Sequence, residues 1–251
     1  MIVDRMSHPT VYGARAKLGV IVPPTNTANE AEWNRLAPAG VTIHATRMKL
    51  HTDIQSAAGK RALLEDVKRH ALDLAQAGVS VIAYGCTAGS LTVPAAELPD
   101  YMERETGFPC VTTAQALVEA LRVLGAKRVA VATPYHDALN RHEAEFLHAH
   151  GFEVVSLRGM GYGAGGVAEY RNIARVPASE VHAFAAGVMT PAAEALLISC
   201  TDFATLDVIG RLEAETGRPV VSSNQATFWL ALRKAGIVDR LAGAGRLLAQ
   251  A

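Results

Sequence analysis

ETGFPCVTTAQALVEALRVLG (residues 105–125) and ETGRPVVSSNQATFWLALRKAG (residues 215–236) are two copies of one pattern in a chain of 251 residues. Their first residues, Glu105 and Glu215, are 110 positions apart. Upstream, KLGVIVPPTN (residues 17–26) matches RVAVATPYHD (residues 128–137) at a similar spacing, and both run from an apolar stretch into a proline-containing loop. Matched blocks in the same order indicate an internal duplication.

A third pair of matched blocks contains two of the three cysteines. VSVIAYGCTAGSL (residues 79–91) places Cys86, and EALLISCTDFATL (residues 194–206) places Cys200, each directly after a short apolar run. Such runs are typical of buried strands. The carboxyl ends of parallel strands lie at one edge of a sheet, so we expect each cysteine to face a cleft between the two halves.

Each half alternates apolar strands with amphipathic helices, which predicts an α/β fold with parallel sheets. We expect two lobes related by a pseudo-twofold axis, each a four-stranded parallel sheet flanked by helices. The predicted boundaries are residues 16–120 and 121–251, with residues 1–15 as a flexible N-terminal segment. We also expect the C-terminal helix to pack back on the first lobe. The glycine-rich residues 159–166 are interpreted as a mobile loop.

Composition and charge exclude several classes of protein. The formal net charge is zero, which argues against a nucleic-acid partner. No apolar run approaches the roughly 20 residues of a membrane span, and no signal peptide is evident, so we expect a cytoplasmic protein. The sequence has no CxxC, HExxH or strand-associated GxGxxG motif, so we expect that the protein binds no metal and no cofactor.

Free cysteine is often simply a buried core residue. Cys86 and Cys200 differ because a short polar stretch follows each of them and is expected to open a helix. A helix N-terminus offers unpaired N–H groups that stabilise a thiolate and bind carboxylate. The duplication places the two thiols opposite each other, which predicts a catalytic pair. Cys110, whose repeat counterpart is Val220, is expected to be a packing residue.

Six motifs carry a resemblance to the aspartate/glutamate racemase superfamily: GVIVPPTNT (19–27), YGCTAGS (84–90), ATPYHDALN (132–140), RNIARVP (171–177), ISCTD (198–202) and PVVSSNQATFW (219–229). Within it the chain is most similar to maleate cis-trans isomerase, with arylmalonate decarboxylase as a close relative. The resemblance covers nearly the whole chain after about residue 16.

This resemblance implies cofactor-independent isomerisation of maleate, or a substituted maleate, to fumarate. Cys86 would add to the double bond as a thiolate, and Cys200 would act as the opposing acid and base. The partner would be a small dicarboxylate substrate, and relatives of this kind suggest a homodimer or higher homo-oligomer. Residues expected to bind substrate come from the strand-end loops and one later segment: Pro24, Thr25, Asn26, Thr87, Tyr135, Asn172, Thr201 and Asp202.

Three alternatives remain open. An amino-acid or hydantoin racemase would use both thiols as bases and needs a partner for the substrate nitrogen, for which Asp202 is the candidate. An arylmalonate-type decarboxylase would need an apolar pocket, which Tyr84, Met160 and Phe203 are expected to supply. That enzyme resembles this chain but has a glycine where Cys86 stands. A non-catalytic anion binder would explain the cleft but not the two thiols.

Overall fold

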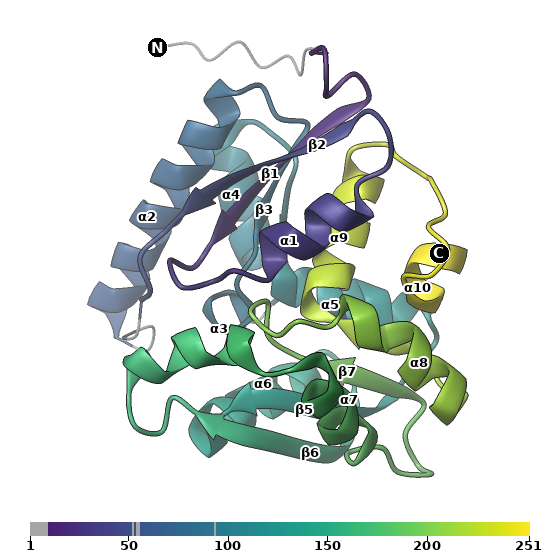
Figure 1. Cartoon of the computed structure of the whole chain (residues 1–251). Coiled ribbons are helices and arrows are strands. Elements are labelled where there is room, and N and C mark those ends of the chain that lie inside the picture. The colour runs from purple at the N-terminus through teal and green to yellow at the C-terminus, as the bar shows by residue number, and fades with distance from the viewer. Residues whose placement is uncertain (1–9, 52, 54–55, 93) are drawn as a thin grey trace.

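The computed structural model describes residues 10–51, 53, 56–92 and 94–251. It contains two four-stranded parallel sheets, one above the other in Figure 1. The strand orders β2-β1-β3-β4 and β6-β5-β7-β8 are the same in both halves, as a duplication requires. The strands are β1 (Ala16–Val22), β2 (Val41–Arg47), β3 (Val81–Tyr84), β4 (Cys110–Thr112), β5 (Arg128–Tyr135), β6 (Glu153–Tyr162), β7 (Ala195–Ile198) and β8 (Val220–Ser222).

Helices cover both sheets, which confirms the predicted α/β fold of two similar lobes. They are α1 (Asn29–Leu36), α2 (Ala57–Gln76), α3 (Thr87–Ser90), α4 (Glu97–Thr106), α5 (Thr113–Val123), α6 (Asp137–Ala149), the 3₁₀ helix η1 (Val167–Arg175), α7 (Ala178–Ala186), α8 (Leu206–Thr216), α9 (Ser223–Lys234) and α10 (Gly245–Gln250). In the described part of the chain, no helix has both the length and the apolar character needed to cross a membrane.

The repeated sequence blocks form the same local structures. Gly107 and Gly217 end α4 and α8 in the left-handed conformation, with φ of 75° and 67°. That conformation is accessible to glycine without steric cost. Thr112 and Ser222 then cap α5 and α9, because each hydroxyl accepts the N–H of the Gln three residues later. The repeated motif therefore specifies a helix end, a short strand and a helix start.

The two lobes share one apolar core. A single cluster of buried side chains includes residues of β1, β3, α5, β5, β7 and α9. Helices α5 and α9 pack against each other, and α9 also contacts β3 and β4 of the first sheet. We expected the C-terminal helix to pack on the first lobe. Helix α9 makes that contact, whereas the last helix, α10, packs on α8, α9 and β8.

Two expectations on connecting segments need correction or qualification. The glycine-rich stretch is not simply a loop, because β6 continues to Tyr162, which pairs with Tyr135 of β5. Of the N-terminal segment expected to be flexible, residues 1–9 lie outside the described residues. Arg15, at its end, forms an ion pair with Asp239, with 2.6 Å between Nη2 and Oδ1.

A buried carboxylate on α1 also joins the lobes. Glu32 is 5% exposed, and its Oε1 accepts the backbone N–H groups of Thr205 (2.5 Å) and Leu206 (2.7 Å). Its Oε2 accepts the side-chain amide of Asn224 at 2.8 Å. Burial raises the pKa of Glu32, and these donors counteract that shift. Glu32 therefore satisfies donors that would otherwise be buried without partners.

We expect Glu32→Ala to lower the free energy of unfolding by about 3 kcal/mol, because it leaves the buried N–H donors that Glu32 accepts without an acceptor. Urea denaturation measures this loss. The control is Glu30→Ala on the same helix, which removes only a partly exposed ion pair with Arg47 and should cost less than about 1 kcal/mol. Equal effects of the two substitutions would contradict the role of Glu32.

Candidate active site

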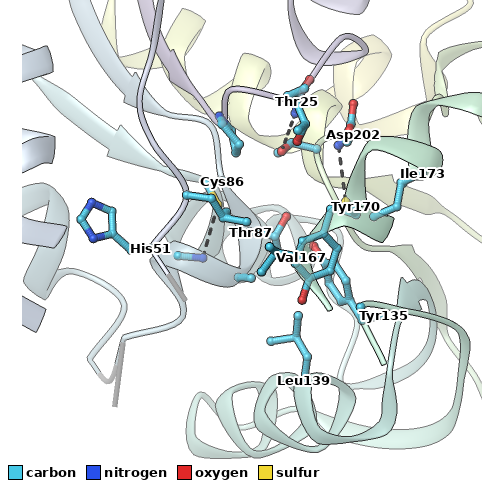
Figure 2. A pocket seen from close by; sticks show the side chains of 18 of the residues that line it. Thr25, His51, Cys86, Thr87, Tyr135, Leu139, Val167, Tyr170, Ile173 and Asp202 are labelled. Atoms are coloured by element: carbon cyan, nitrogen blue, oxygen red, sulfur yellow. Dashed lines mark hydrogen bonds between the residues drawn. The ribbon is translucent and has the colours of Figure 1, made fainter. Parts of the chain in front are cut away.

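A cavity of about 410 Å³ lies between the lobes, at the carboxyl ends of β1, β3, β5 and β7. Both Cys86 and Cys200 line it, one from each lobe. Figure 2 shows the side chains of the strand-end loops converging on this cavity with those of α6 and η1. The predicted position of the site, at the strand ends between two similar halves, agrees with this geometry.

Cys86 follows β3 and is the N-cap residue of α3. Its Sγ accepts the N–H of Gly89 at 3.4 Å and a hydrogen bond from the Tyr84 hydroxyl. A side chain at position 89 would displace the Tyr84 hydroxyl, since an added Cβ would lie 2.3 Å from Tyr84 Oη and 3.2 Å from the sulfur. The local sequence thus allows a phenol, a thiol and a helix start to meet at one point.

Cys200 follows β7 in a strained backbone conformation. Its φ is 106°, and no other non-glycine residue in the described part of the chain has a positive φ. Its Sγ accepts the N–H of Asp202 at 3.4 Å and a hydrogen bond from the Tyr135 hydroxyl. The helix expected directly after Cys200 is absent there, because residues 201–205 form turns and α8 begins only at Leu206.

The electrostatics of the thiols differ from the expectation of stabilised thiolates. Burial raises the pKa of Cys86, and the donors Gly89 and Tyr84 only partly oppose this. Burial likewise raises the pKa of Cys200 to about 12, although Tyr135 lowers it. Desolvation of a charged sulfur outweighs the available hydrogen bonds at both positions. Both thiols are therefore protonated at neutral pH.

Asn26 reaches the cavity but is also a structural link. Its Oδ1 accepts the N–H groups of Ala28 (3.1 Å) and Asn29 (3.0 Å), and its Nδ2 donates to Thr201 Oγ1 at 3.0 Å. Thr201 in turn donates to the carbonyl of Gly85, also at 3.0 Å. The chain Asn26–Thr201–Gly85 ties together three of the loops that carry the site.

Asp202 also connects the lobes. Its Oδ1 accepts the N–H of Thr27 at 2.9 Å, and a second hydrogen bond comes from the N–H of Ala28. Burial raises the pKa of this carboxyl to about 6, and the backbone donors oppose the rise. The carboxylate of Asp202 therefore accepts hydrogen bonds from the loop after β1 and is less available to a ligand in the cavity.

Most of the residues predicted to bind substrate line the cavity: Thr25, Asn26, Thr87, Tyr135, Thr201 and Asp202. Pro24 does not line it, and its side chain is exposed to solvent. Asn172 also does not line it, and its Oδ1 accepts a hydrogen bond from Arg175 at 3.3 Å. These two are corrections to the predicted set.

The geometry of a 3₁₀ helix explains why Asn172 misses the cavity. Residues three apart eclipse one another on such a helix, so Val167, Tyr170 and Ile173 share the face of η1 that lines the cavity. Figure 2 shows Tyr170 and Tyr135 among the side chains that line the site. The segment 171–177 therefore reaches the cavity through Ile173 and not through Asn172.

Sequence reasoning missed two further groups that line the cavity. One is basic or titratable and comes from the loop after β2 and from α6: Lys49, His51 and His142. They lie with His136, the N-cap residue of α6, which the strand-end loop of the ATPYHDALN motif already supplied. The other is apolar: Met48, Leu50, Leu139, Val167 and Ile173. The spacing of Val167, Tyr170 and Ile173 was the available signal for η1, and it becomes informative only if a 3₁₀ helix is assumed.

Other expected residues lie elsewhere. Cys110 is fully buried in β4, where burial raises its pKa to about 12, and it packs with the core around α2 and α4. Of the aromatic and apolar residues considered for an aryl pocket, Tyr84 lines the cavity, whereas Met160 and Phe203 do not. Phe203 is fully buried in the core of the second lobe.

The fold and cavity define a two-lobed α/β protein in which each lobe presents one thiol to a shared pocket. The family model for arylmalonate decarboxylase matches residues 18–248, and the chain belongs to this family. It is 35% identical over 227 residues to the arylmalonate decarboxylase of Bordetella bronchiseptica, covering 87% of this chain and 90% of that protein. The family is one of enzymes, and the named relatives of this chain include maleate isomerases as well as an arylmalonate decarboxylase.

Similarity to the isomerases is of the same order. The chain is 31% identical over 247 residues to the maleate isomerase of Nocardia farcinica, covering 93% of this chain and 96% of that protein. A solved structure of a cysteine-to-serine mutant of the Nocardia farcinica enzyme contains a covalently bound succinylcysteine intermediate. That structure matches with a TM-score of 0.80 and 29% identity, over 94% of this chain and 99% of the other.

Because burial raises the pKa of both thiols, alkylation of Cys86 and Cys200 by iodoacetamide should accelerate steadily from pH 7 to pH 10. Below its pKa, the thiolate fraction rises about tenfold per pH unit. Tyr84→Phe should slow alkylation of Cys86, and Tyr135→Phe that of Cys200, because each loses a donor that lowers its thiol's pKa. Peptide mass spectrometry reports each site separately. A plateau below pH 8 would contradict this prediction.

Proposed function

We propose that this protein catalyses the cis-trans isomerisation of maleate, or of a substituted maleate, to fumarate or its substituted counterpart through a covalent adduct at Cys86. The observation that carries the proposal is the presence of one thiol from each lobe in a single cavity. A reaction that adds a nucleophile to one alkene carbon and a proton to the other requires two such groups. The succinylcysteine intermediate of the related isomerase supports the same chemistry.

In the proposed reaction, the sulfur of Cys86 is the nucleophile and the sulfur of Cys200 is the acid and base. Cys86 first loses its thiol proton to solvent, and the resulting thiolate forms a C–S bond to one alkene carbon while the π electrons move toward the other carbon and its carboxylate. The Cys200 thiol gives its proton to that carbon, which leaves a succinyl adduct on Cys86. The former double bond rotates as a single bond. Cys200 then removes the proton and the C–S bond breaks, which releases the trans product and restores both sulfurs. No cofactor takes part.

Hydrogen-bond donors in the cavity would hold the two carboxylates and the charge that develops on them. The candidates are the hydroxyls of Thr25, Tyr135 and Tyr170, together with backbone N–H groups of the loop after Cys86. Lys49, His51, His136 and His142 line the same cavity, and Lys49 and His51 both contact the Asp66 carboxylate, at 3.1 Å and 2.8 Å. Asp202 is the only acidic side chain among the described residues that line it.

The decarboxylase alternative has support from the 35% identity to an arylmalonate decarboxylase and from the apolar residues of the cavity. Against it stands Cys86, because the resemblance places a glycine at this position in arylmalonate decarboxylase. The racemase alternative relies on Asp202 as a partner for the substrate nitrogen. That carboxylate already accepts the N–H groups of Thr27 and Ala28, which makes it a poor site for an ammonium group.

The decisive measurement is a proton NMR time course with maleate in deuterated buffer, without added metal or nucleotide. We expect conversion of the maleate singlet to that of fumarate. Cys86→Ala and Cys200→Ala should each lower kcat by more than about a thousandfold, because the reaction needs both sulfurs. Cys110→Ala is the matched control, as it removes an equally buried thiol from outside the cavity, and it should keep its activity.

In the Cys200→Ser variant, maleate should leave a succinyl adduct on Cys86 that intact-protein mass spectrometry detects. The opposite result is equally clear. If maleate is untouched and Cys86→Ala still releases carbon dioxide from an arylmalonate, the protein is a decarboxylase and the isomerase proposal fails.

The apolar lining predicts tolerance of a substituent on the substrate. A pocket of about 410 Å³ lies within the range of about 300–1,000 Å³ that accommodates drug-sized ligands, so a four-carbon dianion fills only part of it. We expect 2-methylmaleate to be isomerised with a kcat/KM at least equal to that of maleate. Val167→Trp should lower this value by about tenfold or more for 2-methylmaleate and less for maleate. Val123→Trp is the control, because Val123 is similarly exposed (53% against 52%) but lies outside the cavity.

A further inference from the structure

The Ser-Ser-Asn-Gln stretch at the start of α9 has several roles within the fold. Ser222 caps the helix, Asn224 binds Glu32 and Asn29, and Gln225 donates to the carbonyl of Ala244 at 2.6 Å. Ser223 differs from these neighbours because its hydroxyl reaches the loops that carry the two thiols. It is fully buried and does not line the cavity, so it has no direct access to substrate.

One oxygen atom of Ser223 contacts both cysteine loops. Its Oγ accepts the backbone N–H of Cys200 at 3.0 Å. The same Oγ lies 2.9 Å from Oγ1 of Thr87, and either hydroxyl can donate in that pair. Thr87 directly follows Cys86 and is 1% exposed. A single hydroxyl in the second lobe thus bridges the main chain at one thiol and the residue next to the other.

The backbone conformation of Cys200 indicates that its hydrogen bond to Ser223 has a structural role. A positive φ is unfavourable for a residue with a side chain, and it persists only where the surrounding structure fixes it. The N–H that Ser223 accepts belongs to Cys200 itself, the residue with φ of 106°. The hydrogen bond therefore holds the peptide whose orientation points Sγ into the cavity.

The duplication provides an internal comparison. Thr113 is the repeat counterpart of Ser223, and it is also fully buried. Its hydroxyl donates to the carbonyl of Tyr84 at 3.2 Å rather than accepting the N–H of Cys86. Thr227 links the two, since its Oγ1 lies 3.1 Å from Thr113 Oγ1 and 2.7 Å from the carbonyl of Ser223. Of these hydroxyls, only that of Ser223 is bonded to both cysteine loops.

We propose that Ser223 is a positioning residue that sets the placement of the Cys86 and Cys200 sulfurs relative to each other through its bonds to Thr87 and to the Cys200 N–H. The inference rests on the proposed two-thiol reaction, because only such a reaction requires a fixed relation between the sulfurs. A displacement of about 1 Å between reacting groups can cost a factor of about 100 in rate. Substrate binding depends on other residues, so the effect should fall on kcat more than on KM.

The test compares Ser223→Ala with Ser223→Thr and with the matched control Thr227→Val. Thr227→Val removes an equally buried hydroxyl at the same interface without touching either cysteine loop. Four quantities are measured for each variant: Tm, kcat and KM for maleate, the pH profile of kcat, and the separate alkylation rates of Cys86 and Cys200.

We expect Ser223→Ala to lower kcat by about tenfold or more, with a KM within about threefold of the original value. Its alkylation rate at Cys200 and its pH profile should also change, because the strained peptide is released. Ser223→Thr should recover most of the activity by restoring the hydroxyl. Thr227→Val should lower Tm by a similar amount and leave kcat, the pH profile and both alkylation rates unchanged.

Two results would overturn the proposal: an unchanged kcat in Ser223→Ala, or an equal loss of kcat in Thr227→Val, which would show a general packing effect. If Ser223→Ala does not fold, Thr87→Val removes the other member of the hydroxyl pair. Because Thr87 also lines the cavity, its effect is scored on the alkylation rate of Cys200, on the other side of Ser223, which should change, and an unchanged rate would overturn the proposal. If the unmodified protein leaves maleate untouched, the proposed function fails. The alkylation rates still test Ser223, and no change at Cys200 in Ser223→Ala would then refute its positioning role.

Discussion

Buried hydrogen bonds between the two lobes hold the strand-end loops in place, and the rest of the site depends on them. The amide of Asn26 in the first lobe donates to Thr201 in the second, and Thr201 donates back to the carbonyl of Gly85. Glu32, through Thr205, and Ser223, through Thr87, add further links of the same kind. These groups are shielded from water, so a broken bond would leave a donor or acceptor unpaired. The polar interface therefore favours one arrangement of the lobes, and with it one arrangement of the two thiols.

The same burial shapes the chemistry of the thiols. In a cavity shielded from water, the charged form of each sulfur is disfavoured, and the pKa of Cys200 reaches about 12. Each sulfur has a tyrosine hydroxyl and a backbone N–H that partly counteract this shift. A thiolate formed under these conditions is poorly solvated, which makes it a reactive nucleophile toward an alkene. Protonated resting thiols are also less prone to oxidation than exposed thiolates would be.

Several features of the fold were predictable because they depend on local sequence and on its repetition. The matched strands, the glycine helix ends and the hydroxyl caps each follow from a few neighbouring residues, and they recur in both halves. The positions of Cys86 and Cys200 followed from strand ends alone. The predictions that were wrong concern segments whose backbone path is irregular. The residues after Cys200 form turns instead of a helix, and a 3₁₀ helix presents Tyr170 instead of Asn172.

By itself, the sequence determined the duplicated α/β architecture and the presence of one thiol at a strand end in each half, because periodicity and turn residues act over short distances. Only the tertiary structure decided the charge state of those thiols, the partners of Asn26, Glu32 and Asp202, and the bridging position of Ser223. Asn26, Glu32, Asp202 and Ser223 each have a hydrogen-bond partner more than 100 positions away in the chain. Burial and hydrogen bonding between such groups are set by how the lobes pack, and the pattern of either segment alone does not contain that information.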